Sequence, residues 1–230
     1  MSPPRIRWVN HASYIVEAGG LTLATDPWLF GAAFNNGWDL LSATKLGISE
    51  LSSVDYIWVS HEHPDHFAPA VLKAIPAASR ERITVLYQRT RDGKVLDFCR
   101  KLGFQTQELP PREWISLRTP LRVLCGPSDD FDSWLLADAD GRRILNLNDC
   151  IIDSPEKALS VRASTGQVDV LLTQFGYAQW LGNPDESALR AEAAREKLER
   201  IRIQAETFRP RFIIPFASYV YFSHEENQYL

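Results

Sequence analysis

The sequence predicts an α/β fold in which two packed β-sheets carry helices on their outer faces. Two patterns indicate this fold: β-rich runs occur in two groups along the chain, and helical segments follow each group. The length agrees, because 230 residues with 45% hydrophobic content can bury a substantial core as one domain. We therefore expect a single domain over residues 1–230, and a functional motif close to Leu230 leaves open a longer natural chain.

The first half of the chain predicts one sheet with its helices. Three short strands come first, and Gly19-Gly20 forms the turn between the second and the third. A long loop over residues 26–47 is rich in aromatic side chains, which either form a lid over a binding site or pack on the domain. Strands are expected at 5–9, 13–17, 21–25, 54–60 and 83–87, and helices at 69–74 and 93–102.

The second half predicts the other sheet and a long helix. Asp140-Gly141 is a hairpin turn between two of its strands. The helix over residues 183–208 has apolar side chains at three-and-four spacing, which predicts one core-packed stripe of Leu189, Ala193, Leu198, Ile201, Ala205 and Phe208. Strands are expected at 114–117, 121–125, 133–137, 143–147, 168–173 and 212–216.

Composition narrows the classes of partner. A net charge of −4 and a pI near 5.8 give no electrostatic reason to expect a nucleic acid. The apolar run over residues 212–222 is broken by Pro215 and is far shorter than a membrane span, so we expect no membrane association. Three widely spaced cysteines without a C-x-x-C pair indicate buried thiols in a reducing compartment. We therefore expect a cytoplasmic protein with neither a nucleic-acid nor a membrane partner.

The strongest chemical signal is the hexapeptide HEHPDH that begins at His61. It holds three of the five histidines of the chain. Side chains two apart in an extended segment point the same way, and Pro64 keeps His63 extended, so His61 and His63 should share one side. The chain must then turn, which lets Asp65 and His66 face the same cavity. Imidazole and carboxylate ligands are typical of zinc, iron or manganese sites.

Four candidate ligands this close in sequence suit two metal ions better than one. A dinuclear site also needs a bridging carboxylate and a late histidine. The sequence offers Asp149 at the end of a predicted strand and His224 after the last strand. Neither residue alone indicates a ligand, and both gain that role from the pattern of the whole chain.

That pattern resembles the metallo-β-lactamase superfamily, in which H-x-H-x-D-H follows an apolar strand. Shorter stretches agree in order, namely NHAS at 10–13, TDPW at 25–28 and ND at 148–149. Together they look like the branch that contains ascorbate-phosphate lactonase and N-acylphosphatidylethanolamine phospholipase D. The likeness is closer to the metallo-β-lactamase-like part of CMP-N-acetylneuraminate hydroxylase, through residues 132–150, 168–175 and 209–217. The resemblance covers nearly the whole chain and implies a four-layer αββα sandwich.

The resemblance also implies ligand roles. His61 and His63 resemble ligands of a first metal, Asp65, His66 and His224 resemble ligands of a second, and Asp149 matches the bridging carboxylate. The superfamily usually has a third histidine for the first metal, but residues 125–132 contain none. Asp129 or Asp130 could supply an oxygen ligand instead; otherwise the first site is weakened or one metal is bound. An added carboxylate shifts the preference from zinc toward iron or manganese.

Other residues near the motif have open roles. His11 could be a catalytic residue that contacts a metal ligand or the substrate, or it could be a hydrogen-bonded structural histidine. Asp26 could orient a ligand histidine or form an Asx-Pro turn. Trp28, Tyr177 and Trp180 are candidate substrate contacts, with aromatic packing as the alternative.

Two reactions are expected of such a site. In the first, two metals activate water to hydrolyse a small-molecule ester, lactone, phosphoester or amide, and Asp65 orients the water and moves its proton. In the second, two irons and O2 hydroxylate a substrate, with electrons from an external electron-transfer partner because no Rieske-type spacing occurs. Hydrolysis is the commoner reaction of the superfamily, and it is favoured on that ground alone.

Overall fold

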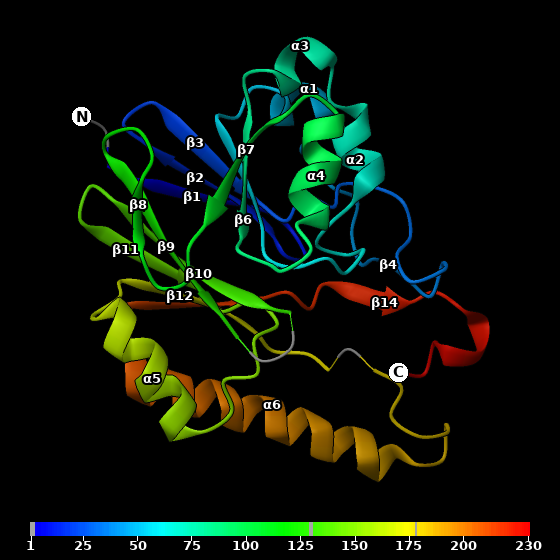
Figure 1. Cartoon of the computed structure of the whole chain (residues 1–230). Helices are drawn as coiled ribbons and strands as arrows, with labels where there is room; N and C mark the ends of the chain where they lie inside the picture. Colours follow the sequence, from blue (N-terminus) through cyan, green and yellow to red (C-terminus); the bar gives the residue numbers. More distant parts are fainter. Residues whose placement is uncertain (1–2, 129–130, 178) are drawn as a thin grey trace.

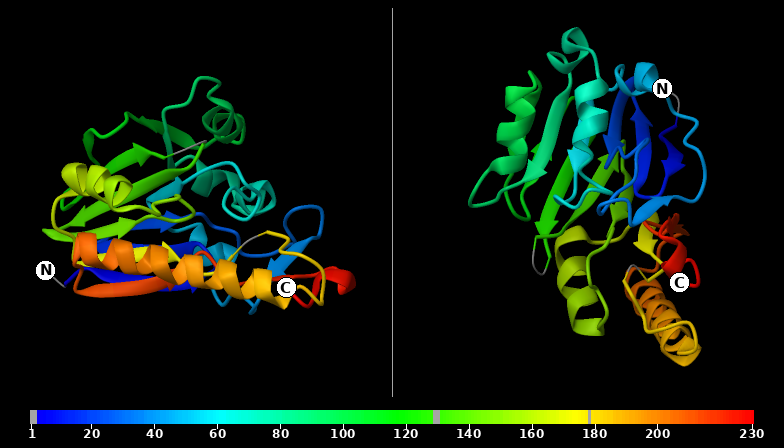
Figure 2. Two further views of the ribbon diagram at one scale, coloured as in Figure 1. Left: turned by 90° about the horizontal axis from the view of Figure 1, so that it is seen from below. Right: turned by 90° about the vertical axis from the view of Figure 1, so that its right-hand side faces the viewer.

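The computed structural model describes residues 3–128, 131–177 and 179–230, which form four layers (Figure 1). Two six-stranded sheets pack face to face. Figure 2 shows the helices of the N-terminal half on one outer face and the long helix of the C-terminal half on the other. This architecture confirms the predicted αββα sandwich.

The N-terminal half of the chain builds the first sheet. Its strands are β1 (Arg5–Asn10), β2 (Ser13–Ala18), β3 (Leu21–Thr25), β5 (Tyr56–Val59), β6 (Thr84–Gln88) and β7 (Gln105–Leu109). The order is β1-β2-β3-β5-β6-β7, antiparallel as far as β3 and parallel beyond it. Its outer face carries α1 (Ile48–Leu51), α2 (Pro69–Ala74), α3 (Ala77–Arg80) and α4 (Lys94–Lys101). All of β5 is buried, as expected for a central parallel strand covered on both faces.

The second sheet comes from the C-terminal half. Its strands are β8 (Trp114–Ser116), β9 (Leu121–Pro127), β10 (Ser133–Ala139), β11 (Arg142–Asn146), β12 (Val170–Gln174) and β13 (Phe212–Phe216). The order is β13-β12-β11-β10-β9-β8, with antiparallel pairing from β8 to β11 and parallel pairing from there to β13. α5 (Pro155–Thr165) and α6 (Ser187–Phe208) cover its outer face.

The apolar core lies in layers that alternate with the sheets. Neighbouring side chains of one strand enter different layers because they point to opposite faces. Trp58 of β5 packs between the sheets with Leu23 and Leu135, whereas Ile57 packs under the helices of the first sheet. The sandwich therefore holds its strand ends in fixed positions, and both β5 and β11 end where the candidate site lies.

The stripe predicted for α6 was wrong in part. Leu189 and Leu198 are 50% and 63% exposed, while Gln204 and Phe208 are buried. The inward face of the helix also holds Lys197, which is half-buried. A hydrophobic pattern could not reveal this face, because the most buried side chain before Phe208 is the polar Gln204.

Several elements were not predicted. The 26–47 loop contains β4 (Trp38–Leu40), which pairs with β14 (Val220–Phe222), and a short 3-10 helix η1 (Glu225–Asn227) follows. The helix α5 and the strand β7 were also missed. In the part of the chain that the structure describes, no helix has the length and apolar character needed to cross a membrane.

Candidate metal centre

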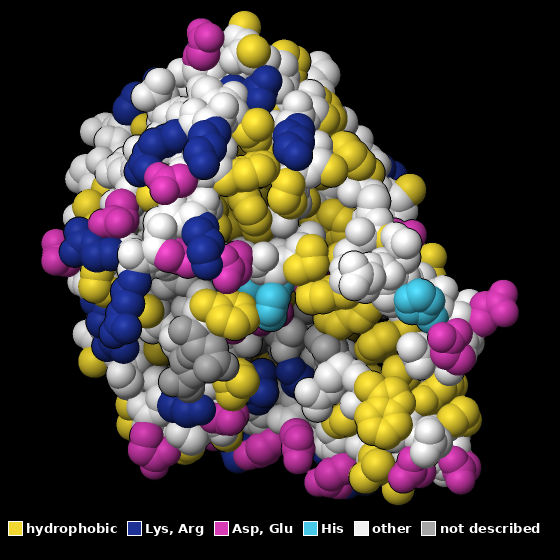
Figure 3. Space-filling view, turned by 45° about the vertical axis from the view of Figure 1, so that its right-hand side comes forward, with side chains coloured by type: hydrophobic (Ala, Val, Ile, Leu, Met, Phe, Trp, Pro, Cys, Tyr) yellow, Lys and Arg dark blue, Asp and Glu magenta, His cyan; other side chains and the backbone are white. Residues whose placement is uncertain are grey.

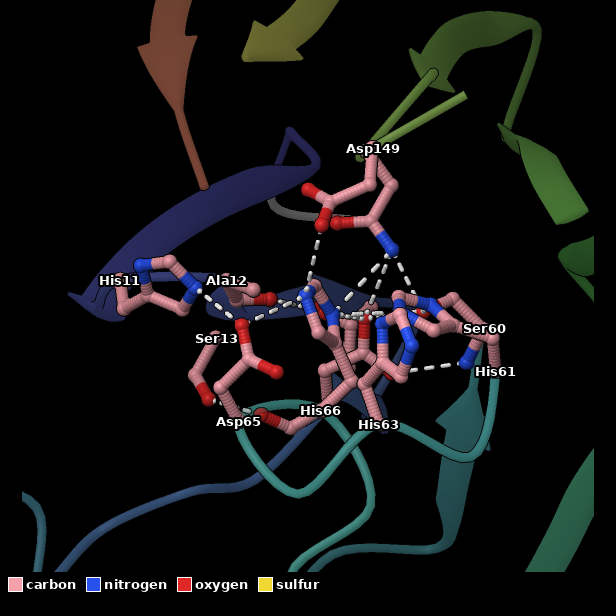
Figure 4. Close-up of polar contacts among 12 residues, drawn as sticks. His11, Ala12, Ser13, Ser60, His61, His63, Asp65, His66 and Asp149 are labelled. Carbon is pink, nitrogen blue, oxygen red and sulfur yellow. Dashed lines mark hydrogen bonds and ion pairs between the residues drawn. The ribbon is translucent and has the colours of Figure 1, made fainter. Parts of the chain in front are cut away.

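The hexapeptide follows the carboxyl end of the central strand β5. Figure 4 shows its histidines and Asp65 gathered close to Asp149. His61 is fully buried and His63 is half-buried. His61 Nε2 lies 3.0 Å from His63 Nδ1, so the two rings share one side as the extended segment predicts.

Asp65 and His66 complete the turn and are 2% and 0% exposed. His66 Nε2 lies 3.2 Å from Asp65 Oδ2 and 3.4 Å from Asp149 Oδ2. The centroids of the His66 and His61 rings are 4.1 Å apart. The four predicted ligands of the motif therefore form one group with Asp149.

His11 reaches the same group from the turn between β1 and β2. Its Nε2 lies 3.1 Å from Asp65 Oδ2, and its side chain is 2% exposed. Its backbone is fixed because its carbonyl accepts a hydrogen bond of 3.0 Å from the amide of Ala217, just after β13. His11, Asp65 and His66 each offer a ligand atom within 4.8 Å of the others.

Asp149 comes from the second sheet, three residues after the end of β11. Asn148 before it has a φ of 51°, a left-handed conformation that asparagine tolerates better than most residues and that turns the chain here. Asp149 forms a second group of potential ligands with His61 and His66. Its Oδ1 accepts a hydrogen bond of 3.0 Å from Gln174 Nε2.

Asp26, fully buried at the end of β3, orients His66. Its Oδ2 lies 3.0 Å from His66 Nδ1, and it also accepts bonds of 2.7 Å from the Ser60 amide and 3.1 Å from Asn148 Nδ2. A carboxylate on one ring nitrogen fixes the tautomer and leaves the other nitrogen available for a metal. Of the two roles expected for Asp26, the geometry supports the orienting one.

Burial and charge set the protonation of the group. Burial lowers the pKa of His61 to about 2, with His66 adding to the effect, so His61 is neutral at pH 7. Burial also acts to lower the pKa of His66, but Asp65 and Asp149 outweigh it and raise that pKa well above its usual value. Burial acts to raise the pKa of Asp65, and His66 and His11 hold it well below its usual value.

The group fits a metal ion. Asp65 Oδ1 and His66 Nε2 are buried without a hydrogen-bond partner among the described residues, which is rare for polar atoms in protein interiors. Ligand atoms that share one metal at roughly 2.1 Å lie about 3 to 3.5 Å apart. The contacts that link His11, Asp65, His66 and Asp149 measure 3.1, 3.2 and 3.4 Å.

The structure does not bring His224 to this group. His224 precedes η1, is exposed, and has its Cδ2 only 3.9 Å from where a Cβ on Gly37 would lie. The neighbouring Ser223 amide donates to the Gly37 carbonyl at 3.0 Å. Because β14 pairs with β4, the segment that carries His224 lies against the 26–47 loop and not at the ligand group. The predicted ligand role of His224 therefore finds no support.

The acidic stretch before β10 is described only in part. Asp129 and Asp130 lie outside the described residues, so their ligand role stays a prediction. Asp132 was not predicted, although it belongs to the same stretch, and its Oδ1 lies 3.2 Å from His61 Nδ1. In this position Asp132 holds the ring nitrogen that faces away from His63, which leaves His61 Nε2 for a metal.

The three predicted substrate contacts differ in their surroundings. Trp28 is 2% exposed and its ring packs edge-on against His11 at 5.8 Å, so it supports His11 and has no surface for a substrate. Tyr177 lines a cavity of about 480 Å³ and donates from its hydroxyl to the Leu230 carbonyl at 2.8 Å. Trp180 is 61% exposed.

The accessible side of the group has an aromatic rim. The rings of Phe34 and Phe131 lie 5.7 and 4.7 Å from the His63 ring and are both partly exposed. Figure 3 shows a histidine at the edge of a hollow with hydrophobic side chains on either side of it. These two rings therefore border the half-buried His63 side chain.

Fold and ligand group together define an αββα protein with a candidate metal centre at the strand ends. The model of the beta-lactamase superfamily domain matches residues 5–216. The chain therefore belongs to this superfamily, the metallo-β-lactamase superfamily that its metal motif predicts.

Proteins that this chain is similar to, in sequence or in fold, include both hydroxylases and a hydrolase. The chain is 27% identical to cytidine monophosphate-N-acetylneuraminic acid hydroxylase of Cricetulus griseus over 98% of its own length and 42% of that protein. CmlA, a diiron beta-hydroxylase from Streptomyces venezuelae, superposes with a TM-score of 0.69 at 18% identity, covering 95% of this chain and 45% of that one. Isothiocyanate hydrolase from Delia radicum gut bacteria superposes with a TM-score of 0.66 at 14% identity, covering 96% of this chain and 86% of that one. The chain thus spans less than half the length of the hydroxylases.

Proposed function

We propose that this protein is a metal-dependent hydrolase whose two metal ions activate water against a small-molecule ester, lactone, phosphoester or amide. The observation that carries the proposal is the convergence of His11, Asp65, His66 and Asp149, whose contacts measure 3.1 to 3.4 Å. Beside these contacts, the buried Asp65 Oδ1 has no hydrogen-bond partner among the described residues. When bound, such metals lower the pKa of a water molecule and stabilise negative charge on the substrate.

The proposed ligand set differs from the predicted one in a single residue. His11, Asp65 and His66 would hold the second metal, with His11 in the place predicted for His224. His61 and His63 would hold the first metal, with Asp129 or Asp130 as a further candidate. Asp149 would serve both, because it is grouped with His61 as well as with His66.

The residues around the proposed metal ions could supply the other functions that hydrolysis needs. Asp65 Oδ1 is buried and unpartnered among the described residues, so it can accept the proton of an attacking water. Asp26 keeps His66 oriented, and the aromatic rings of Phe34 and Phe131 border the His63 side chain. No protein nucleophile is required.

Hydroxylation is the second candidate, and the relatives favour it. The hydroxylase of Cricetulus griseus matches 98% of this chain, and a ligand set of imidazole and oxygen donors suits iron. Electrons would have to come from an external donor. The groups of potential ligands among the described residues contain no cysteine, and all three thiols are buried.

Metal analysis of protein purified without oxygen separates the two candidates. Stoichiometric zinc together with oxygen-independent cleavage of an ester or lactone panel supports hydrolysis. Two irons, an optical change on adding O2 to the reduced protein, and no cleavage by any metal form would defeat it and favour hydroxylation. In either case His63→Ala should lower the metal content and abolish activity while the fold survives, and unchanged metal content would contradict the site assignment.

A further inference from the structure

A charged side chain of α6 is connected to Asp149. Lys197 is half-buried, and its Nζ donates a hydrogen bond to Oε1 of Gln174, the last residue of β12. Gln174 Nε2 donates in turn to Asp149 Oδ1 at 3.0 Å. One amide therefore lies between an ammonium group on the outer helix and a carboxylate of the candidate metal centre.

The chemistry of the three groups fixes the direction of this connection. An ammonium group can only donate hydrogen bonds, and an ionised carboxylate can only accept them. A glutamine between them satisfies both, with its oxygen toward Lys197 and its nitrogen toward Asp149. The positive charge also polarises the amide, which strengthens the bond that Gln174 donates to the carboxylate.

The helix that carries Lys197 is itself held in place by a buried side chain. Gln204, two turns further along α6, is fully buried; its Oε1 accepts from Thr173 Oγ1 at 2.6 Å and its Nε2 donates to the Ile152 carbonyl at 3.0 Å. These bonds tie α6 both to β12 and to the loop over residues 147–154, which contains Asp149. The bonds of Gln204 therefore fix the helix backbone that carries Lys197, and with it the position of Lys197 relative to Asp149.

The two oxygens of Asp149 consequently have different surroundings. Oδ1 is occupied by Gln174, while Oδ2 lies 3.4 Å from His66 Nε2 among the ligand atoms. The Asp149 side chain is 20% exposed, so little water is available to replace the bond from Gln174.

We propose that Lys197 and Gln174 are positioning residues that hold Asp149 so that it offers only Oδ2 to the metal ions. This inference rests on the proposed metal centre, but it holds for hydrolysis and hydroxylation alike. Burial lowers the pKa of Lys197 to about 8, and Arg200 adds to this effect, so the ammonium form still predominates at pH 7.

Three substitutions separate the two bonds. Lys197→Met removes the first bond and leaves Gln174 in place. Gln174→Glu keeps an acceptor for Lys197 but cannot donate to Asp149. Lys197→Arg keeps a cationic donor and should rescue. Arg195→Met is the matched control, because Arg195 lies on the exposed face of the same helix.

The probe is cobalt(II), followed by equilibrium titration and by its visible absorption spectrum. Lys197→Met and Gln174→Glu should each weaken cobalt binding by about 10-fold or more and change the spectrum, as loss of partners behind metal ligands typically does. Lys197→Arg and Arg195→Met should stay within about threefold of the unaltered protein. Melting of the metal-free variants checks that each has folded.

A crystal structure of the zinc-loaded protein gives the direct test. The expected result is Asp149 Oδ2 on metal with Oδ1 still bound to Gln174, whereas both oxygens on metal would overturn the proposal. Cobalt binding by Lys197→Met and Gln174→Glu that matches Arg195→Met would overturn it too, while leaving the proposed function intact. If the unaltered protein binds no metal ion, both proposals fail.

Discussion

The first sheet supplies most of the candidate ligands, and the second supplies Asp149. Those of the first sheet contact one another directly, and all except His63 are almost fully buried. Asp149 is more exposed and is held by a strand residue and a helix residue that are themselves far apart in sequence. Ligands that are close in sequence can thus be positioned by contacts with one another. A ligand that is distant in sequence depends on hydrogen bonds from residues that are not ligands.

The largest expected effect contrasts two histidines from these regions. His66→Ala should weaken zinc binding by more than about 100-fold, because it removes a ligand that lies between Asp65 and Asp149. His224→Ala should leave zinc binding unchanged, since His224 is exposed beside Gly37. Equilibrium dialysis of both variants measures the contrast, and equal losses would restore His224 as a ligand.

The support within the first sheet is tested by Asp26→Ala. This change removes the acceptor of His66, Ser60 and Asn148, so zinc affinity should fall by about 10- to 100-fold. The metal-free protein should also lose about 2 to 3 kcal/mol of unfolding free energy, because buried donors are left without partners. Urea unfolding and zinc titration measure the two effects. An effect on unfolding without any effect on zinc would reduce Asp26 to a structural residue.

The pH dependence of metal binding tests the protonation state of His66, a candidate ligand of the first sheet. Asp65 and Asp149 overcome the effect of burial and raise the pKa of His66, so His66 is protonated at neutral pH without metal. A metal must displace that proton, and affinity should therefore increase with pH by up to about tenfold per unit. Calorimetry in buffers of different ionisation enthalpy counts the released protons. Uptake without proton release would contradict this protonation state.

The smallest expected effect concerns the outer face of α6. Leu198→Ala should change the unfolding free energy by less than about 0.5 kcal/mol, because Leu198 is 63% exposed. Phe208→Ala should cost about 3 to 5 kcal/mol, because Phe208 is 1% exposed in the core beneath the second sheet. Urea unfolding of the two variants compares them, and similar losses would mean that α6 packs by the stripe predicted from sequence.

Local patterns predicted much of the fold and most of the proposed ligand set. All strands of the two sheets except β7, and the helix at 69–74, follow from periodicity, turn residues and Pro69, which act within a few residues. The hexapeptide was recognisable for the same reason. α5 was missed although Ser154 caps it and Pro155 opens it, because few of its side chains form an apolar stripe.

The remaining parts of the site depend on long-range pairing. The proposed choice of His11 over His224 rests on the pairing of β14 with β4 and on the bond from Ala217 to His11, which no local pattern encodes. Lys197 belongs to a charged stretch that predicts a solvated helix face, and only the packing of α6 turns it inward. The sequence could therefore predict the class of site but not its full set of residues.

The hydrogen bond from the Ala217 amide to the His11 carbonyl also joins the far edge of one sheet to the first turn of the other. A cation bound by both His11 and Asp149 would add a second link between the two sheets. The stability of the sandwich would therefore depend on the concentration of free metal ion. At a free concentration of 100 times Kd, the bound ion would add about 2.7 kcal/mol against separation. Loss of the metal would then make the sandwich easier to unfold and so easier for proteases to cleave.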